Sequence, residues 1–360
     1  MNEVIAERRL NNQCIANSMI NKPEQVVQEL VAMQAQEYMQ AVWAIGLRTS
    51  SSTLADIEQA IAERKIVLTW ALRGTIHFVP PEDVKWLIQL SASRVMGQGQ
   101  KRLTQLGVDD QTLMRCREII YEALKGHQQI TRSDLLQLLE QVGINTTGQR
   151  GYTILWNLTY QGLICFGPKM GKQQTFVLLD EWVPEARELT LEESIAELAL
   201  RYFTAHGPST VQDFAWWSGI TLTDARMGLE EVKGQLHFEQ LNGSQYWMSR
   251  EVSKTQMLED SGVFLLPGFD EYILGYKDRS AVLSPEYTPM IVPGNNGVFL
   301  PTLVSGGKVK GLWKRTIKSK GIEFVITPFE YIGDKEEQVI IAAERYATFV
   351  GLPITKIKFD

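Results

Sequence analysis

The chain has 360 residues, of which 44% are hydrophobic and 22% charged, and its formal net charge at pH 7 is −6. This is the composition of a soluble globular protein of about two to four domains. No apolar run approaches the roughly 20 residues that a membrane span needs, and the first residues lack the order of a secretory signal, so we expect a cytoplasmic protein without a membrane partner. The three cysteines and four histidines are scattered singly, which predicts no disulfide framework and no metal site.

The first segment, residues 1–105, has the element order of a winged helix. Apolar spacing predicts helices over residues 4–20, from Pro23 onward, and over 54–64. Two strands, 67–70 and 75–79, would then form a hairpin that turns at Arg73 and Gly74. Three helices followed by a hairpin is the winged-helix arrangement, a variant of helix-turn-helix.

A pair of glutamines, Gln34 and Gln36, lies at or just past the end of the second of these helices. Residues two apart do not face each other on a helix, but on a strand or a helix end both amides can point into one cleft. An amide is neutral and carries both a donor and an acceptor, so it can orient a water molecule without being a strong base. The alternative interpretation is two solvent-facing polar residues.

The same order of elements recurs twice. In residues 106–185, helices from Asp110, from Thr131 or Ser133 and from about Thr147 precede strands at 163–166 and 175–179. In residues 186–254, helices over 191–205, after Ser209-Thr210 and over 222–232 precede a hairpin that turns at Asn242-Gly243. The sequence therefore predicts three winged-helix modules in tandem.

After residue 254 the pattern changes to short strands between turn residues, followed by a helix over about 335–350. We predict an α+β protein in which the three tandem modules are followed, over residues 255–360, by a small antiparallel β-barrel-like domain with a C-terminal helix.

Basic residues cluster late in the chain, although the net charge is negative. The run from Lys308 to Lys320 contains no acidic residue, and such a run is either a solvated loop or a phosphate-binding surface. His77 on the first hairpin is either a half-buried structural histidine or a DNA contact. No glycine-rich phosphate loop is present, so we expect no nucleotide cofactor, and no other cofactor is indicated.

Several short motifs, in this order, resemble the AlkZ-like bacterial DNA glycosylases. They are Met33-Gln34-Ala35-Gln36, the stretch from Thr69 to His77, Leu266-Pro267-Gly268-Phe269-Asp270-Glu271-Tyr272, and the basic run from Gly307 to Arg315. The resemblance covers almost the whole chain. It implies a monofunctional DNA glycosylase that excises N7-alkylated purines, in bulky adducts or interstrand cross-links, and leaves an abasic site.

The same resemblance implies the roles of individual residues. Gln34 and Gln36 would be catalytic and hold a water near the anomeric carbon, since an alkylated purine is already a good leaving group. Duplex DNA with alkylated purines would be the partner of a monomeric protein. We propose a DNA contact for His77 and phosphate contacts for Arg73, Lys308, Lys310, Lys314 and Arg315. The competing hypothesis is a non-enzymatic tandem winged-helix DNA-binding or regulatory protein, but the third helix of each of the two later modules carries only one arginine, Arg150 or Arg226, which disfavours groove reading.

Overall fold

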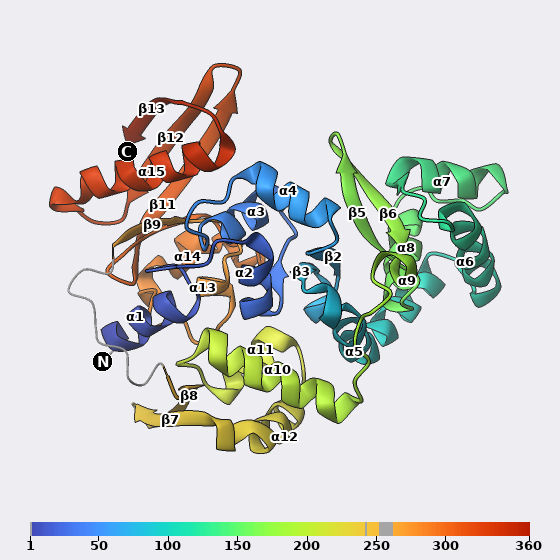
Figure 1. Ribbon diagram of the computed structural model, residues 1–360, viewed down its shortest axis with the longest axis horizontal. Helices are drawn as coiled ribbons and strands as arrows, with labels where there is room; N and C mark the ends of the chain where they lie inside the picture. Colours follow the sequence, from blue (N-terminus) through green and yellow to red (C-terminus); the bar gives the residue numbers. More distant parts are fainter. Residues whose placement is uncertain (1, 242, 252–261) are drawn as a thin grey trace. The chain divides into compact units, whose positions relative to one another are not determined.

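The computed structural model describes residues 2–241, 243–251 and 262–360. The chain divides into two compact units: unit 1 comprises Met1–Ile57 and Ile195–Asp360, and unit 2 comprises Glu58–Ser194. Figure 1 shows the helices and strands in chain order by colour. None of the helices in the described ranges combines the length and the apolarity needed to cross a bilayer.

Unit 2 contains a mixture of helices and strands whose sheet order is β3-β2-β5-β6-β4. Its elements, in chain order after α4 (Leu54–Ala62), which holds the boundary, are β2 (Val67–Trp70), η1 (Leu72–Gly74), β3 (Ile76–Val79), η2 (Pro81–Asp83), α5 (Val84–Gln105), α6 (Asp110–Leu124), β4 (Ile130–Thr131), α7 (Arg132–Gln141), α8 (Arg150–Tyr160), β5 (Ile164–Met170), β6 (Gln173–Leu178) and α9 (Leu179–Trp182).

Aromatic packing and helix caps hold unit 2 together. The buried Trp70 ring lies 4.6 Å from the Phe166 ring and 6.2 Å from that of Phe176, between centroids. Asp109 and Thr131 accept hydrogen bonds from the backbone of the first turns of α6 and α7. The predicted hairpin of residues 67–79 is confirmed, since β2 and β3 pair antiparallel with Trp70 opposite Ile76.

Unit 1 joins the two ends of the chain. Its elements are α1 (Asn2–Asn12), α2 (Pro23–Leu30), β1 (Met33–Gln34), α3 (Tyr38–Gly46), α10 (Leu191–His206), α11 (Val211–Ser218), α12 (Leu222–Val232), η3 (Lys233–Gln235), β7 (Leu236–Leu241), β8 (Ser244–Ser249), β9 (Val263–Leu266), α13 (Glu271–Leu274), η5 (Pro285–Tyr287), α14 (Thr288–Ile291), η6 (Pro293–Asn295), β10 (Thr302–Ser305), β11 (Lys308–Lys318), β12 (Gly321–Pro328), η7 (Gly333–Lys335), α15 (Glu336–Val350) and β13 (Ile354–Phe359). Of the predicted turn at Asn242-Gly243, Asn242 lies outside the described residues.

The C-terminal part differs from the predicted barrel. Its five strands follow the order β13-β12-β11-β10-β9, so within the described residues this is an open sheet with two edges. It is not wholly antiparallel either, because β13 follows α15 and pairs parallel to β12. A strand after this helix was not predicted, because the helix over about 335–350 was expected to be the last element of the chain. Helix α15 packs against the sheet through Tyr346, whose ring lies 5.4 Å from that of Trp313 (Figure 1).

The N-terminal helices also differ from the prediction. Helix α1 ends at Asn12 rather than Ile20, and two helices that the sequence reading passed over, α3 and α5, follow the glutamine pair and the first hairpin. Helix α3 is buried from Ala41 to Gly46, so it lacks the polar face whose periodicity would have marked it.

Candidate functional site

The two glutamines lie in a short extended segment between α2 and α3, here called the glutamine loop (residues 33–36). Met33 and Ala35 are 1% and 3% exposed, whereas Gln34 is half-buried and Gln36 is exposed. This alternation has the period of a strand, so both amides lie on the same, outer side while the residues between them pack inward. The predicted strand-like spacing of the pair is therefore present.

A rare backbone turn sets the start of this loop. Val31 closes α2 with φ +67° and ψ −50°, and the Ala32 amide donates to the Leu30 carbonyl at 2.8 Å. This is a γ-turn with positive φ, a conformation that is strained for a β-branched residue and costs about 1–3 kcal/mol. Val31 is fully buried, so packing holds the turn in place. The turn thereby sets the position of the backbone that leads to Gln34.

A buried carboxylate binds the backbone of the glutamine loop. Glu271, 1% exposed, accepts a hydrogen bond from the Gln34 backbone amide at its Oε1 (3.2 Å) and from Trp217 Nε1 at its Oε2 (2.7 Å). His206 Nε2 lies 3.5 Å from the same Oε2. Burial lowers the pKa of His206, although Glu271 acts to raise it. The imidazole is therefore neutral near pH 7.

The residue before this carboxylate makes a second buried connection. Asp270 receives two hydrogen bonds from Arg48, both 2.8 Å long, and the two side chains are 1% and 0% exposed. Burial acts to lower the pKa of Arg48, but the attraction and hydrogen bonds of Asp270, together with Glu271, raise it above its usual value. Since Arg48 follows α3, the ion pair ties the far end of that helix to the segment holding Glu271.

The segment Pro267–Tyr272 thus lies against both ends of α3. The Gly268 amide donates to Gln40 Oε1 at 3.2 Å, and a side chain at position 268 would meet the Phe299 carbonyl oxygen at 2.6 Å, so the close approach requires glycine. Two of the motifs behind the family resemblance, more than 200 residues apart, form one contiguous structure. Sequence reasoning grouped them only by resemblance.

Two predicted contacts, Arg73 and His77, belong to unit 2. Arg73 lies in η1 with φ +56° and lines a hollow of about 330 Å³ together with Arg102, Tyr152 and Trp156. His77 is 1% exposed, and its Nδ1 is 2.9 Å from the Thr75 carbonyl oxygen. Burial of the side chain favours the structural alternative for His77, and its role as a DNA contact stays a prediction.

The basic run follows β11 after a turn at Gly306 and Gly307, both with positive φ. The register of β11 with β10 shifts next to Lys310, but burial alternates along the strand, so Lys308, Lys310 and Lys314 share the less buried face. Arg315 lies on the other face. There the Arg315 guanidinium lies 4.8 Å from the centroid of the Tyr346 ring. On the lysine face, Lys310 forms an ion pair with Glu330, Lys308 Nζ donates to the Ala281 carbonyl, and Lys314 is exposed.

The anchoring role of Glu271, Trp217 and His206 was not predicted from the sequence, although Glu271 belongs to one of the motifs that carry the family resemblance. Trp217 is a buried helix residue, and its position on the apolar face of its helix predicts only a core residue. His206 was one of several isolated histidines. The available signal was the Asp270-Glu271 pair, which follows the apolar strand β9 after three residues, since acids that are buried need partners. In the ranges that the structure describes, no three His, Cys, Asp or Glu side chains are grouped as metal ligands would be.

A sequence model of the family "DNA glycosylase AlkZ-like" matches residues 27–349, a range that contains the glutamine loop and its anchor. The chain belongs to this family. The interstrand DNA cross-link repair glycosylase of Streptomyces sahachiroi is 26% identical to this AlkZ-like chain over 345 residues, which cover 91% of this chain and 89% of that protein. The solved structure of Streptomyces sahachiroi DNA glycosylase AlkZ matches with a TM-score of 0.82 and 23% identity, covering 99% of both chains, and thus shares the fold.

Membership in the AlkZ-like family makes the chain a DNA glycosylase, a hydrolase that acts on N-glycosyl bonds. DNA is therefore its partner. The enzyme interpretation of the sequence is confirmed, and so is the resemblance on which it rested.

Proposed function

We propose that this AlkZ-like chain is a monofunctional glycosylase for N7-alkylated purines in duplex DNA, including bulky adducts or interstrand cross-links, and that Gln34 and Gln36 carry the chemistry. The observation that supports this assignment is the pair of outward amides on a loop whose backbone is held by the buried Glu271 carboxylate. The Streptomyces relative is named for the repair of interstrand cross-links, which supports the substrate class. We further propose that the protein works as a monomer without a cofactor.

In the proposed reaction, water attacks the anomeric carbon while the bond to the purine nitrogen breaks. The alkylated purine is cationic, so it leaves with the bonding electron pair as a neutral base and needs no proton. The two amide oxygens accept hydrogen bonds from the water and stabilise the positive charge that develops on the sugar. One proton of the water stays on the new hydroxyl of the anomeric carbon and the other is released to solvent, which leaves an abasic site.

Backbone contacts would hold the duplex during this step. In unit 1 we propose Lys308, Lys310 and Lys314, which share one face of β11, and in unit 2 we propose Arg73. Arg315 stays a prediction separate from this group, because its guanidinium lies against Tyr346 on the opposite face of the strand. His77 is left out because it is buried.

The test is an oligonucleotide duplex that carries one N7-methylguanine, incubated with excess protein and then treated with alkali to cleave at abasic sites. We expect cleavage by the wild type only after alkali, since a monofunctional enzyme leaves the strand intact. Loss of a preorganised polar group typically costs about 10²–10³-fold in rate, so Gln34→Ala/Gln36→Ala should lose excision by at least that factor.

A matched control is Gln25→Ala/Gln28→Ala, which removes two exposed amides from the preceding helix α2. This variant should excise at the wild-type rate. Equal excision by both double variants would remove the glutamine pair from the mechanism. If the wild type binds the duplex but does not excise N7-methylguanine, the proposed activity on small N7-alkylated purines is contradicted. A duplex with a bulkier N7 adduct would then test the proposed activity on bulky lesions.

A further inference from the structure

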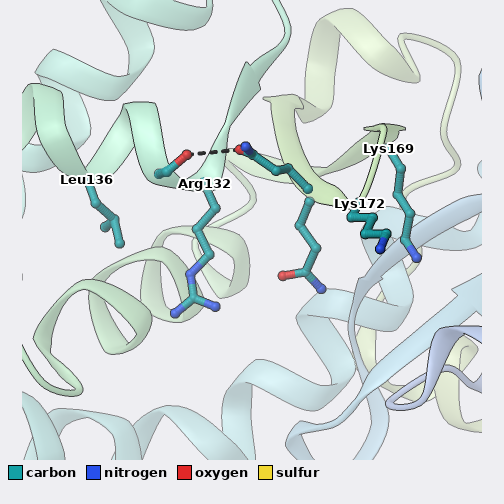
Figure 2. A pocket seen from close by; sticks show the side chains of 7 residues that line it. Arg132, Leu136, Lys169 and Lys172 are labelled. Atoms are coloured by element: carbon teal, nitrogen blue, oxygen red, sulfur yellow. Dashed lines mark hydrogen bonds between the residues drawn. The ribbon is translucent and has the colours of Figure 1, made fainter.

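A hollow in unit 2 gathers cations that the sequence reading did not select. It has a volume of about 640 Å³ and is here called the basic hollow. Its lining residues come from the first turns of α7 and from the hairpin β5–β6: Arg132, Ser133, Leu136, Lys169, Lys172, Gln173 and Gln174. Figure 2 shows Arg132 on the helix side of the hollow and Lys169 and Lys172 on the hairpin side.

Local geometry fixes both sides of the basic hollow. Met170 pairs with Gln173, so the hairpin turns at Gly171, with φ +61°, and Lys172. On the other side, Thr131 caps α7. A hydrogen bond of 3.0 Å from Ser133 Oγ to Gln173 Oε1 joins the helix to the hairpin (Figure 2). The lysines therefore stand on an element that is tied to the start of the helix.

The charged side chains that line the hollow are all positive. Three of its lining residues are cationic and none is a carboxylate. The nearest acid in sequence, Asp134, accepts a hydrogen bond from Thr131 Oγ1 at 2.6 Å and so belongs to the helix cap. Partial burial lowers the pKa of Lys169, while the charge of Glu58 acts to raise it. Gathering like charges without a carboxylate in the lining costs free energy, which an anion in the hollow would recover.

The chemistry of the lining favours phosphate groups of a polymer. Leu136 is the one apolar side chain among the lining residues, whereas pockets for small organic ligands are mainly apolar. Lysine and arginine together with hydroxyl and amide donors are the groups that contact DNA phosphates, and such contacts position a duplex without reading its sequence.

We propose that the basic hollow binds backbone phosphates of duplex DNA, as a contact surface additional to the residues named above. This inference rests on the proposal that the chain acts on duplex DNA. It assigns to Lys169, Lys172 and Arg132 a contribution to affinity that is independent of base sequence and of the lesion.

The test uses the full chain and a short undamaged duplex, with binding measured over a series of salt concentrations. Lys169→Gln/Lys172→Gln keeps side-chain length but removes two charges. Because each neutralised phosphate contributes about 0.9 to the slope of log K against log salt, we expect this variant to bind more weakly and its slope to be shallower by about 1.8. Arg132→Gln should lower the slope by about half as much.

The matched control is Lys125→Gln/Lys233→Gln, which changes the net charge equally. Each of these exposed lysines is paired with a glutamate three residues before it. The control should keep the wild-type slope, and a wild-type slope in the hollow variant would overturn the inference. Since the duplex is undamaged, this result is independent of excision: failure of the N7-methylguanine test with a reduced slope in the hollow variant would contradict the proposed chemistry and support the hollow.

Discussion

The charged side chains are buried beneath the glutamine loop, whereas the lysines of the basic hollow are exposed. Beneath the loop, Glu271, Asp270 and Arg48 are almost completely buried, and the groups that face outward are neutral amides. In the hollow, Lys169 and Lys172 are exposed. A buried network is costly to interrupt because each partner depends on the others, whereas an exposed lysine is stabilised by solvent whatever its neighbours are.

This difference predicts which property each region controls. Substitutions beneath the glutamine loop should alter stability and the rate of base excision, because they move the backbone that carries Gln34. Substitutions in the hollow should alter affinity and its salt dependence, with little effect on stability. This distinction would be contradicted if substitutions beneath the glutamine loop changed mainly the affinity for DNA and its salt dependence. It would also be contradicted if substitutions in the hollow changed mainly stability.

The largest effect is expected for Asp270→Ala, which leaves the Arg48 guanidinium charged, buried and without its carboxylate. Removing one partner of a buried ion pair typically costs about 3–5 kcal/mol of the free energy of unfolding. Urea unfolding followed by tryptophan fluorescence would measure it. The control is Glu239→Ala, which breaks the more exposed Arg8–Glu239 pair and should cost about 0–1 kcal/mol. Equal destabilisation by the two variants would contradict the buried network as the stronger support.

A smaller effect, on rate, is expected for Glu271→Gln. The new amide keeps one acceptor, but its NH2 group must face either the Gln34 amide or Trp217 Nε1, both of which are donors. A hydrogen bond to a charged group contributes about 1.5–3 kcal/mol, so we expect the single-turnover excision rate to fall by roughly 10–100-fold while affinity for undamaged duplex is kept.

Two further variants show whether Glu271 acts as a positioning residue. Trp217→Phe removes only the Nε1–H donor and should reduce the excision rate less than Glu271→Gln does. Glu344→Gln, an exposed change on α15, should leave the rate unchanged. A fall in duplex affinity that parallels the fall in rate would point to a general structural defect and contradict positioning of Gln34.

The sequence predicted helices and strands well where a proline, a capping residue or glycines mark their ends. Pro23 at the start of α2, Thr131 at the cap of α7 and the paired glycines before β11 all have local physical causes and all are in place. Strand β13 and helix α3 were missed, because their polarity patterns depend on which face the rest of the protein covers. The glutamine pair could be selected from its spacing. Glu271 could be noticed as part of an acidic pair, but its role as the anchor could not be predicted, since its partner Gln34 lies 237 residues away.

The smallest expected effect is a pH dependence of stability from His206. Its ring is fully buried and stacks on Tyr202 at 4.7 Å. Burial lowers its pKa below the ordinary value of 6.5. As pH falls below 6.5, the unfolded chain takes up a proton before the folded one does, so stability declines until the lowered folded pKa is passed.

His206→Gln removes this proton uptake while keeping a polar side chain of similar reach. Urea midpoints measured between about pH 7.5 and 5.5, the range in which histidine titrates, should fall more steeply with acid for the wild type than for the variant. Every other ionisable group is the same in both proteins, so the difference between the two curves isolates His206. Identical curves would show that the imidazole beside Glu271 has the same pKa in the folded and unfolded chain, and the buried network would then not depend on a neutral histidine.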